Sequence, residues 1–375
     1  MEQGASGFTF GGDALPDRAV KGRGAIGNRP GRFETLRHVA LDDGWDAGMP
    51  ERDKTSPTMP VVTTLTADTS RTVIARNDSP DIPFDRSVNP YRGCEHGCVY
   101  CFARPSHAYL DLSPALDFET KILTKPEAPR ILAEELRHPS YKPAPLALGS
   151  NTDPYQPVER RLKITRGILQ VLSAFSHPVT IVTKSALVLR DLDIIAPMVA
   201  RGLTNVAISI TTLDDGLARR MEPRAATPIR RLETLAALSQ AGIPTVVMAA
   251  PMIPGLNDHE LERILEAAAE TGVNTAGTIL LRLPHELKPI FTDWLHMHFP
   301  DRARRVFSLL RQCRSGKLNE SAFGQRMTGG GVVAALLNRR FRIACKRLSL
   351  DRGVPALDCG QFSPPPRPGD QLSLF

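Results

Sequence analysis

The stretch NPYRGCEHGCVYC, residues 89–101, carries three cysteines with the spacing C-x3-C-x2-C. Thiolates are soft ligands that suit iron–sulfur clusters, zinc or copper. Most cubane clusters take four cysteines, but no fourth cysteine lies near Cys94, Cys98 and Cys101. Three thiolates leave one iron of a cubane open, and an open iron can bind a substrate or cofactor. The spacing therefore predicts a [4Fe-4S] cluster with one exchangeable position.

A zinc knob made of three cysteines and a histidine is the alternative for this segment. Structural zinc sites usually show two ligand pairs, and the sequence contains no second pair. Cys313, Cys345 and Cys359 are scattered along the chain, so we expect them to be ordinary thiols. His96 lies between two ligands and is expected to face solvent or support the loop. The pattern favours iron–sulfur over zinc.

Composition limits the class of protein. The chain has 375 residues, 42% of them hydrophobic, and a formal net charge of +7, which permits an anionic partner such as nucleic acid but does not require one. Six cysteines are too few for a disulfide scaffold at this length. No apolar run reaches the ~18 residues of a membrane span, and the first ten residues lack an apolar signal core. The sequence predicts a cytoplasmic protein with no membrane partner.

Short apolar runs alternate with amphipathic stretches from residue 85 onward, which predicts a parallel α/β fold. Several runs are almost continuously apolar, as is typical of strands buried on both faces. The expected strands are 87–90, 146–149, 179–183, 206–210, 245–250 and 278–281. Six units indicate a partial (β/α)6 barrel, although their spacing fits a doubly wound sheet equally well.

Two of the expected helices carry start and stop signals. One begins with Thr227 as N-cap and Pro228 at the first position, and it ends at Gly242. Asn257 or Asp258 is the expected cap of the next helix. The apolar stripe expected on the first helix is Ile229, Leu232, Leu235 and Ala236.

The chain divides into four predicted regions. Residues 1–83 form an irregular N-terminal extension, and residues 84–285 form the α/β core. Residues 286–358 form a helical basic C-terminal region, and residues 359–375 form a proline-rich tail.

At the cysteine motif the sequence resembles the radical S-adenosylmethionine (SAM) superfamily. That superfamily is marked by C-x3-C-x-aromatic-C after the first strand of a partial (β/α)6 barrel, and Tyr100 occupies the aromatic position. Within it, the chain resembles the spore photoproduct lyase-like, or "DNA repair photolyase", group. The resemblance covers about residues 78–350. It is carried by residues 89–94, 152–157, 182–184, 221–224 and 250–254.

The resemblance implies the cofactors and the reaction type. In that family the open iron chelates the amino and carboxylate groups of SAM, and an electron from the [4Fe-4S] cluster yields a 5′-deoxyadenosyl radical that abstracts hydrogen from substrate. An electron donor such as flavodoxin or ferredoxin is then a partner. The resemblance also implies DNA as the substrate.

The resemblance also suggests cofactor contacts at the carboxyl ends of strands, where parallel barrels place their active sites. Ser150, Thr152 and Asp153 follow the second strand, Lys184 ends the third, and Ser209 lies in the fourth. A cation at Lys184 can pair with the methionine carboxylate, and the Ser209 hydroxyl can reach ribose. The alternative is that residues 152–154 form only a turn and that Lys184 faces solvent.

One departure from the group concerns the hydrogen-atom donor. Spore photoproduct lyase has a donor cysteine near the end of the second strand, whereas residues 149–151 here are Gly-Ser-Asn. This places thymine-dimer reversal by that route in doubt. Tyr109, Tyr155 and Cys313 are candidate donors that nothing in the sequence separates.

The last five residues, QLSLF, resemble the pentapeptide that binds the bacterial DNA polymerase sliding clamp. Such peptides bind in extended form with apolar side chains in a groove. Leu372, Leu374 and Phe375 are the expected anchors, and Gln371 is the expected polar contact. A tail without function is the alternative.

Three functions fit these patterns. The first is a radical enzyme that acts on DNA, as in the repair of a lesion. The second is a radical enzyme that modifies protein, RNA or a small molecule. The third is a non-catalytic metal-binding module that recruits partners.

Overall fold

The computed structural model describes residues 19–34 and 61–366. Its centre is a seven-stranded sheet with the order β10-β9-β8-β7-β6-β3-β2. Neighbours from β3 to β10 pair in parallel, and β2 is antiparallel to β3. The strands are β2 (Ile74–Arg76), β3 (Arg86–Val88), β6 (Leu146–Leu148), β7 (Val179–Thr183), β8 (Thr204–Ser209), β9 (Thr245–Met252) and β10 (Ala276–Leu280).

The six parallel strands overlap the six predicted from the apolar runs. They follow one another across the sheet in chain order, without the reversal that defines a doubly wound sheet. This order confirms the partial (β/α)6 barrel and removes the alternative. The apolar runs are continuous because both faces of the sheet are buried, and all six residues of β8 are buried.

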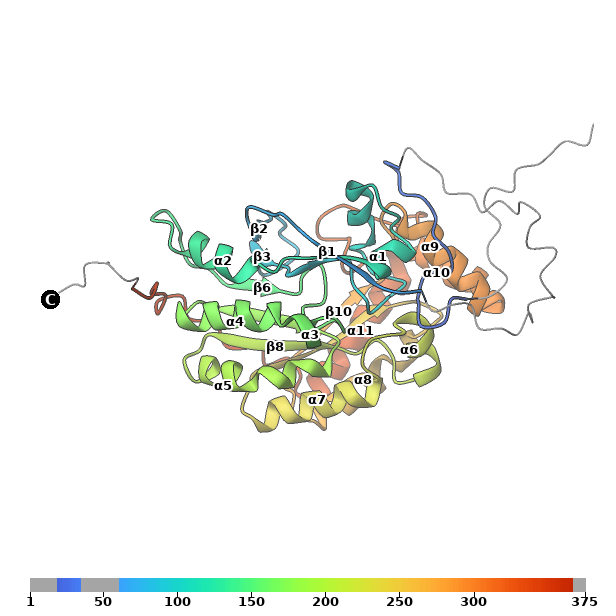
Figure 1. The fold of residues 1–375 in the computed structure, drawn as a ribbon. Coiled ribbons are helices and arrows are strands. Elements are labelled where there is room, and N and C mark those ends of the chain that lie inside the picture. Colours follow the sequence, from blue (N-terminus) through green and yellow to red (C-terminus); the bar gives the residue numbers. More distant parts are fainter. Residues whose placement is uncertain (1–18, 35–60, 367–375) are drawn as a thin grey trace, which may run out of the picture.

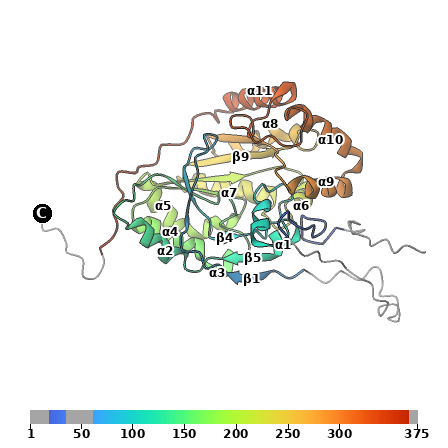
Figure 2. The ribbon, with the colours of Figure 1, turned by 90° about the horizontal axis from the view of Figure 1, so that it is seen from above.

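Helices cover the outer side of the sheet (Figures 1 and 2). Their apolar faces and the strands form one large core, in which Ile168, Leu172, Leu235 and Ile264 are fully buried. These outer helices are α2 (Ala128–Leu136), α4 (Ile164–Ala174), α5 (Leu192–Ala200), α7 (Pro228–Gln240) and α8 (Leu261–Ala269). Shorter helices lie in the connections: α1 (Leu116–Thr120), α3 (Glu159–Leu162) and α6 (Asp215–Met221).

The start of α7 confirms one predicted cap and corrects the predicted stripe. The Thr227 side chain accepts a hydrogen bond from the Arg230 amide, with Pro228 at the first position. Ile229, however, is 59% exposed, whereas Arg231 is 1% exposed. The helix is rotated relative to its apolar pattern because the Arg231 guanidinium is held inside by Glu222, 3.1 Å away.

The predicted cap of α8 is also corrected. Asn257 precedes a short 3-10 turn and makes no side-chain cap bond. Its Oδ1 accepts from the Ile253 amide at 2.6 Å, and its Nδ2 donates to the carbonyls of Thr211 and Pro251 at 2.7 and 3.0 Å. Asn257 therefore fastens the loop after β9 to the end of β8.

The described part of the N-terminal extension contributes strands as well as irregular chain. β1 (Thr64–Ala67) pairs in parallel with β5 (Lys121–Thr124), and β4 (Tyr91–Arg92) pairs antiparallel to β5. Together they form a small sheet of order β1-β5-β4. Because β4 leads directly into Cys94, this small sheet fixes where the cysteine segment begins.

The C-terminal region is helical, as predicted. It comprises α9 (Leu287–His298), α10 (Pro300–Cys313) and α11 (Gly331–Leu348). Trp294 and Leu295 are buried in a second core that also includes Cys98, Val99 and Tyr100. This core joins the C-terminal helices to the cysteine segment.

Residues 350–366 run back along the amino ends of the strands. The Leu350 carbonyl accepts from the Ala276 amide at 2.9 Å, and the Ser363 amide donates to the Phe175 carbonyl at 3.0 Å. Phe362 packs against Tyr141 and His177. The described chain ends beside α4, across the molecule from α9 and α10 (Figure 1). The start of the predicted spacer is thus docked on the body, while residues 371–375 lie outside the described residues.

A search of the described helices found none with the length and apolar character needed to cross a membrane.

Candidate active site

The three cysteines lie on one tight loop that follows β4. Cys94 and Cys98 are buried, and Cys101 is half-buried. The Cys94 amide donates to the Phe118 carbonyl at 2.9 Å. Gly93 turns the chain with a φ of +82°, and a Cβ there would lie 2.8 Å from the same carbonyl oxygen. Glycine is therefore required where the loop begins.

A fully buried arginine holds the middle of this loop. The Arg104 guanidinium donates to the carbonyls of Cys98 at 2.9 Å and Gly97 at 3.1 Å. It also pairs with the buried carboxylate of Glu119. Removing one partner of a buried ion pair costs about 3–5 kcal/mol. The loop conformation therefore depends on this pair.

The N-terminal segment 19–34 crosses the outside of the loop. The Glu119 carboxylate accepts from the amides of Gly24 at 3.0 Å and Ala25 at 2.9 Å. A Cβ on Gly24 would lie only 1.8 Å from the Gly97 carbonyl oxygen. The two backbones are in direct contact, so the extension is part of the cysteine site.

Residues 152–157, after β6, hold the loop from the barrel side. Gln156 is fully buried, and it accepts from the Glu95 amide at 2.8 Å and donates to the Gly93 carbonyl at 3.1 Å. The Thr152 hydroxyl donates to the Tyr91 carbonyl at 2.9 Å. The segment is therefore more than a turn, because its side chains bond both sides of Cys94.

Asp153 joins three strand ends. Its carboxylate accepts from the Thr183 hydroxyl at 2.6 Å and the Lys184 amide at 2.8 Å, and it lies 3.3 Å from His96 Nδ1. Burial alone would raise the pKa of Asp153, but the contacts with His96, Thr183 and the Lys184 amide outweigh it and hold the pKa at about 2. Asp153 is thus an anion that fixes the loop position.

Residues 221–224, at the end of α6 and just beyond it, hold the far side of the loop. The Val99 amide donates to the Met221 carbonyl at 2.9 Å. The Tyr100 hydroxyl donates to the Glu222 carboxylate at 2.7 Å, and Arg224 pairs with Glu95 at 2.9 Å. Tyr100 therefore supports the loop through its hydroxyl as well as its ring.

Lys184 points into this site. Its ammonium nitrogen lies 5.7 Å from the centre of the Tyr100 ring. Burial alone would lower the pKa of Lys184, but Cys98 and Glu222 outweigh it and raise the pKa. Lys184 therefore places a cation beside the cysteine loop, and its amine has no hydrogen-bond or ion-pair partner within residues 19–34 and 61–366.

The other predicted cofactor contacts differ in their surroundings. Ser150 is half-buried, and its hydroxyl oxygen accepts a hydrogen bond from the side-chain Nδ2 of Asn89 at 3.4 Å. Ser209 is buried at the end of β8, and its carbonyl accepts from Arg231 at 3.0 Å. Thr152 uses its hydroxyl for the Tyr91 carbonyl. Contact of these residues with cofactor stays a prediction.

The three candidate hydrogen donors are not brought together. Tyr155 is buried, with Arg190 5.9 Å from its ring centre. Cys313 is buried in a small cluster with Leu280. Tyr109 is 71% exposed and packs against Phe33, outside the barrel. The structure selects none of them.

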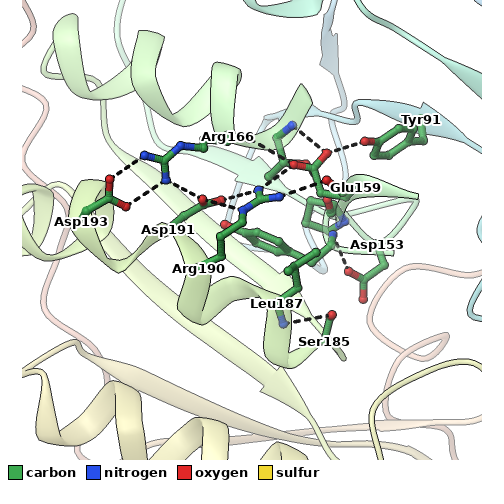
Figure 3. Close-up of polar contacts among 12 residues, drawn as sticks. Tyr91, Asp153, Glu159, Arg166, Ser185, Leu187, Arg190, Asp191 and Asp193 are labelled. Atoms are coloured by element: carbon green, nitrogen blue, oxygen red, sulfur yellow. Dashed lines mark hydrogen bonds and ion pairs between the residues drawn. The ribbon is translucent and has the colours of Figure 1, made fainter. Parts of the chain in front are cut away.

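A network of charged side chains links the connections that follow β6 and β7, next to the site (Figure 3). Buried Glu159 bonds the Tyr91 hydroxyl and pairs with Arg190 at 2.8 Å. Arg190 also pairs with Asp191 at 2.8 Å, and Arg166 extends the chain to Asp191 and Asp193. This network ties β4, which leads into Cys94, to the elements after β6 and β7.

The donor set fits a cluster better than a zinc ion. Within the described ranges, no three His, Cys, Asp or Glu side chains form a group that could hold a single metal ion. A cubane does not need such convergence, because each thiolate binds a different iron. His96 is turned to Asp153 rather than offered as a fourth ligand. Burial raises the pKa of Cys94 well above its usual range and that of Cys98 to about 12, so metal bonding must drive their deprotonation.

Comparison with known proteins agrees with this geometry. The family model of the radical SAM superfamily matches residues 88–268. An uncharacterized protein of Mycobacterium tuberculosis is 40% identical over 236 residues, covering 62% of this chain and 68% of that protein. This chain belongs to the radical SAM superfamily. Its cofactors are therefore a [4Fe-4S] cluster and SAM, and it is an enzyme of the radical SAM type.

Solved structures show the same fold. A spore photoproduct lyase complexed with dinucleoside spore photoproduct has a TM-score of 0.54 at 15% identity, covering 76% of this chain and 79% of that one. A mutant of that enzyme with bound AdoMet and dinucleoside spore photoproduct gives 0.53. The radical SAM enzyme fold predicted from the motif is confirmed.

Sequence reasoning missed the residues that support the loop. Arg104, Glu119, Gln156, Glu222 and Arg231 are all buried. Two of them lay in segments that the resemblance had marked, 152–157 and 221–224. Arg231 and Glu119 gave no signal, because a charged residue in an amphipathic helix is ordinarily placed on its exposed face.

The contact between Gly24 and Gly97 yields a prediction. A Gly24→Ala substitution should lower iron retention at least twofold, because the methyl group must displace the carbonyl between Cys94 and Cys98, at a cost of about 1–3 kcal/mol. Iron per chain and cluster absorbance after anaerobic reconstitution and gel filtration measure the effect. Gly330→Ala is the control, since nothing lies within 4 Å of a Cβ there. Equal iron in both variants would contradict the proposed contact.

Proposed function

We propose that Cys94, Cys98 and Cys101 hold the [4Fe-4S] cluster, that Lys184 binds the carboxylate of SAM, and that the substrate is DNA. The observation that carries the site is the convergence of residues 152–157, Lys184 and residues 221–224 on the one loop that holds all three cysteines. These segments follow strands β6, β7 and β8, at the end of the barrel where parallel α/β enzymes place their chemistry.

The chain's own residues prepare the site for this cofactor pair. When bound, the cluster supplies the electron that cleaves SAM and starts radical chemistry. Asp153 and Gln156 hold the cysteine loop against the barrel, and Glu222 holds Tyr100. Lys184 offers a cation near the loop, and a charge-assisted bond to a carboxylate needs no further reorganisation there. The second core, which contains Trp294, shields the loop from water on the side of α9.

A DNA substrate is supported by three features. The fold resembles that of a spore photoproduct lyase solved with dinucleoside spore photoproduct. The formal net charge is +7, and exposed arginines are frequent on α10 and α11. The tail resembles a sliding-clamp peptide. A protein, RNA or small-molecule substrate is the alternative that the same cofactor chemistry allows.

The tail would suit recruitment to DNA. The described chain ends near the amino ends of the strands, whereas the cysteine loop lies at their carboxyl ends. A clamp held by Gln371, Leu372, Leu374 and Phe375 would therefore leave the mouth of the barrel uncovered.

Replacing Lys184 tests the cofactor site. We expect Lys184→Met to raise the SAM concentration for half-maximal 5′-deoxyadenosine formation by about 10-fold or more, because a charged hydrogen bond is worth about 1.5–3 kcal/mol. Iron content should not change, since the amine bonds nothing else in the described structure. The exposed Lys142 provides the control variant, Lys142→Met. Unchanged SAM dependence in Lys184→Met would remove this residue from the cofactor site.

Turnover with DNA tests the substrate. The reconstituted enzyme, given SAM and a reductant without oxygen, should form more 5′-deoxyadenosine when irradiated DNA is present, and mass spectrometry of the digested DNA should reveal a changed nucleoside. Binding should weaken steeply with salt. If DNA does not bind and the mass change appears only in protein, RNA or small molecules, the DNA proposal is wrong.

The full-length chain tests the tail. Wild-type protein should bind immobilised bacterial sliding clamp saturably, and Leu374→Ala should weaken that binding at least tenfold because it empties one apolar pocket. Ser373→Ala is the matched control, since Ser373 is not one of the expected contacts. Equal binding of the Leu374→Ala and wild-type chains would exclude the motif.

A further inference from the structure

A small pocket opens beside the cysteine loop, in a part of the molecule that the cofactor proposal does not use. Its volume is about 250 Å³, below the usual range for a whole drug-sized ligand, so it suits one compact group. Arg282, His285, Lys288, Asn319, Ser321 and Arg326 line it. Four of these side chains are basic.

Arg282 places the pocket at the mouth of the barrel. It lies two residues after the end of β10. Its guanidinium carbon lies 4.5 Å from the ring centre of Phe102, which directly follows Cys101. Phe102 is 44% exposed, and its ring holds the guanidinium by a cation–π contact. The pocket and the proposed cluster ligands are thus separated by one aromatic side chain.

Arg282 is a half-buried cation among like charges. Neither a hydrogen bond nor an ion pair joins it to any residue in the described ranges. Burial and the charges of Arg326 and Arg314 lower its pKa. Unlike Arg282, both neighbours are engaged: Arg326 pairs with Asp81 at 2.5 Å, and Arg314 bonds the carbonyls of Leu280 and Leu281 at 3.0 and 2.8 Å. An anion in the pocket would relieve the repulsion at Arg282.

The nearby carboxylates do not act as the anionic partner of Arg282. Asp81 is held by Arg326 and by the Gly324 amide at 2.7 Å. Glu320 also lines the pocket, but it accepts from the amides of Ser321 and Ala322 at 2.9 and 3.0 Å. Lys288 adds an exposed ammonium. Asn319 also lines the pocket.

We propose that this pocket binds a phosphate group of the substrate, with Arg282 and Lys288 as its main ligands. A guanidinium matches phosphate with two parallel N–H bonds, and an ammonium adds a point charge. Phosphate held there would place the attached nucleoside toward the cysteine loop. The inference rests on the proposed function for its choice of a DNA phosphodiester, although a free nucleotide offers the same group.

The test measures binding by the reconstituted full chain. Fluorescence anisotropy with a labelled oligonucleotide should give about 10-fold weaker binding for Arg282→Gln, and the slope of log K against log salt should fall by about one. Lys288→Gln, at an exposed position that folding does not need, should act in the same direction. Lys142→Gln removes an exposed charge from the connection that precedes the amino end of β6 and should change binding less than twofold. Unchanged iron content shows that the cysteine loop is intact.

A second arm distinguishes the source of the phosphate. Nucleoside 5′-monophosphate is titrated into the wild-type and Arg282→Gln chains by calorimetry, with inorganic phosphate as a further probe. Arg282-dependent binding of the monophosphate without DNA binding would keep the pocket and overturn the DNA substrate. DNA binding that Arg282→Gln and Lys288→Gln leave unchanged would overturn the pocket and keep the DNA substrate. Binding of neither probe would overturn both.

Discussion

The buried pair of Arg104 and Glu119 is the contact on which the cysteine site depends. Both side chains are fully buried, and burying an ion pair is costly unless every remaining donor and acceptor is used. Here the guanidinium holds the carbonyls of Gly97 and Cys98, and the carboxylate holds the amides of Gly24 and Ala25. One pair therefore fixes the loop from inside and the N-terminal segment from outside.

The remaining contacts to the cysteine loop come from the barrel. The conformation of the loop therefore depends on the fold of the barrel. Gln156 bonds both sides of Cys94, Asp153 reaches His96, and Glu222 reaches Tyr100. Asp153 and Gln156 follow β6, and Glu222 follows β8 and α6. The parallel register places these strand ends at one edge of the sheet, and the polar groups that leave the sheet there meet the loop that follows β4. A shift of β6 or β8 would therefore displace the contacts that hold the cysteine loop.

The sequence allowed the strands to be predicted, because their burial on both faces makes the apolar runs continuous. It also allowed the cysteine motif to be recognised. It did not reveal Arg231 inside α7 or Glu119 inside the core, because the partner of each is seen only in the folded structure. Glu222 lies just after the end of α6, and Arg104 lies 15 residues before Glu119. The prediction for Ile229 failed for the same reason. An apolar stripe determines which face of a helix is buried unless a charged residue with a well-placed partner is buried on another face.

The two proposed binding sites at the mouth of the barrel share one feature, a partly buried cation without an acidic partner in the described structure. Arg231 is matched by Glu222, and Arg314 by backbone carbonyls, so these cations serve the fold. Lys184 and Arg282 have no such partner in the described structure, and a half-buried cation without a partner is costly. They follow β7 and β10, which are separated in the sheet by β8 and β9, so one anion cannot satisfy both. Pairing both cations would take two anionic groups, and the proposed cofactor carboxylate near Tyr100 and the proposed substrate phosphate near Phe102 would supply them.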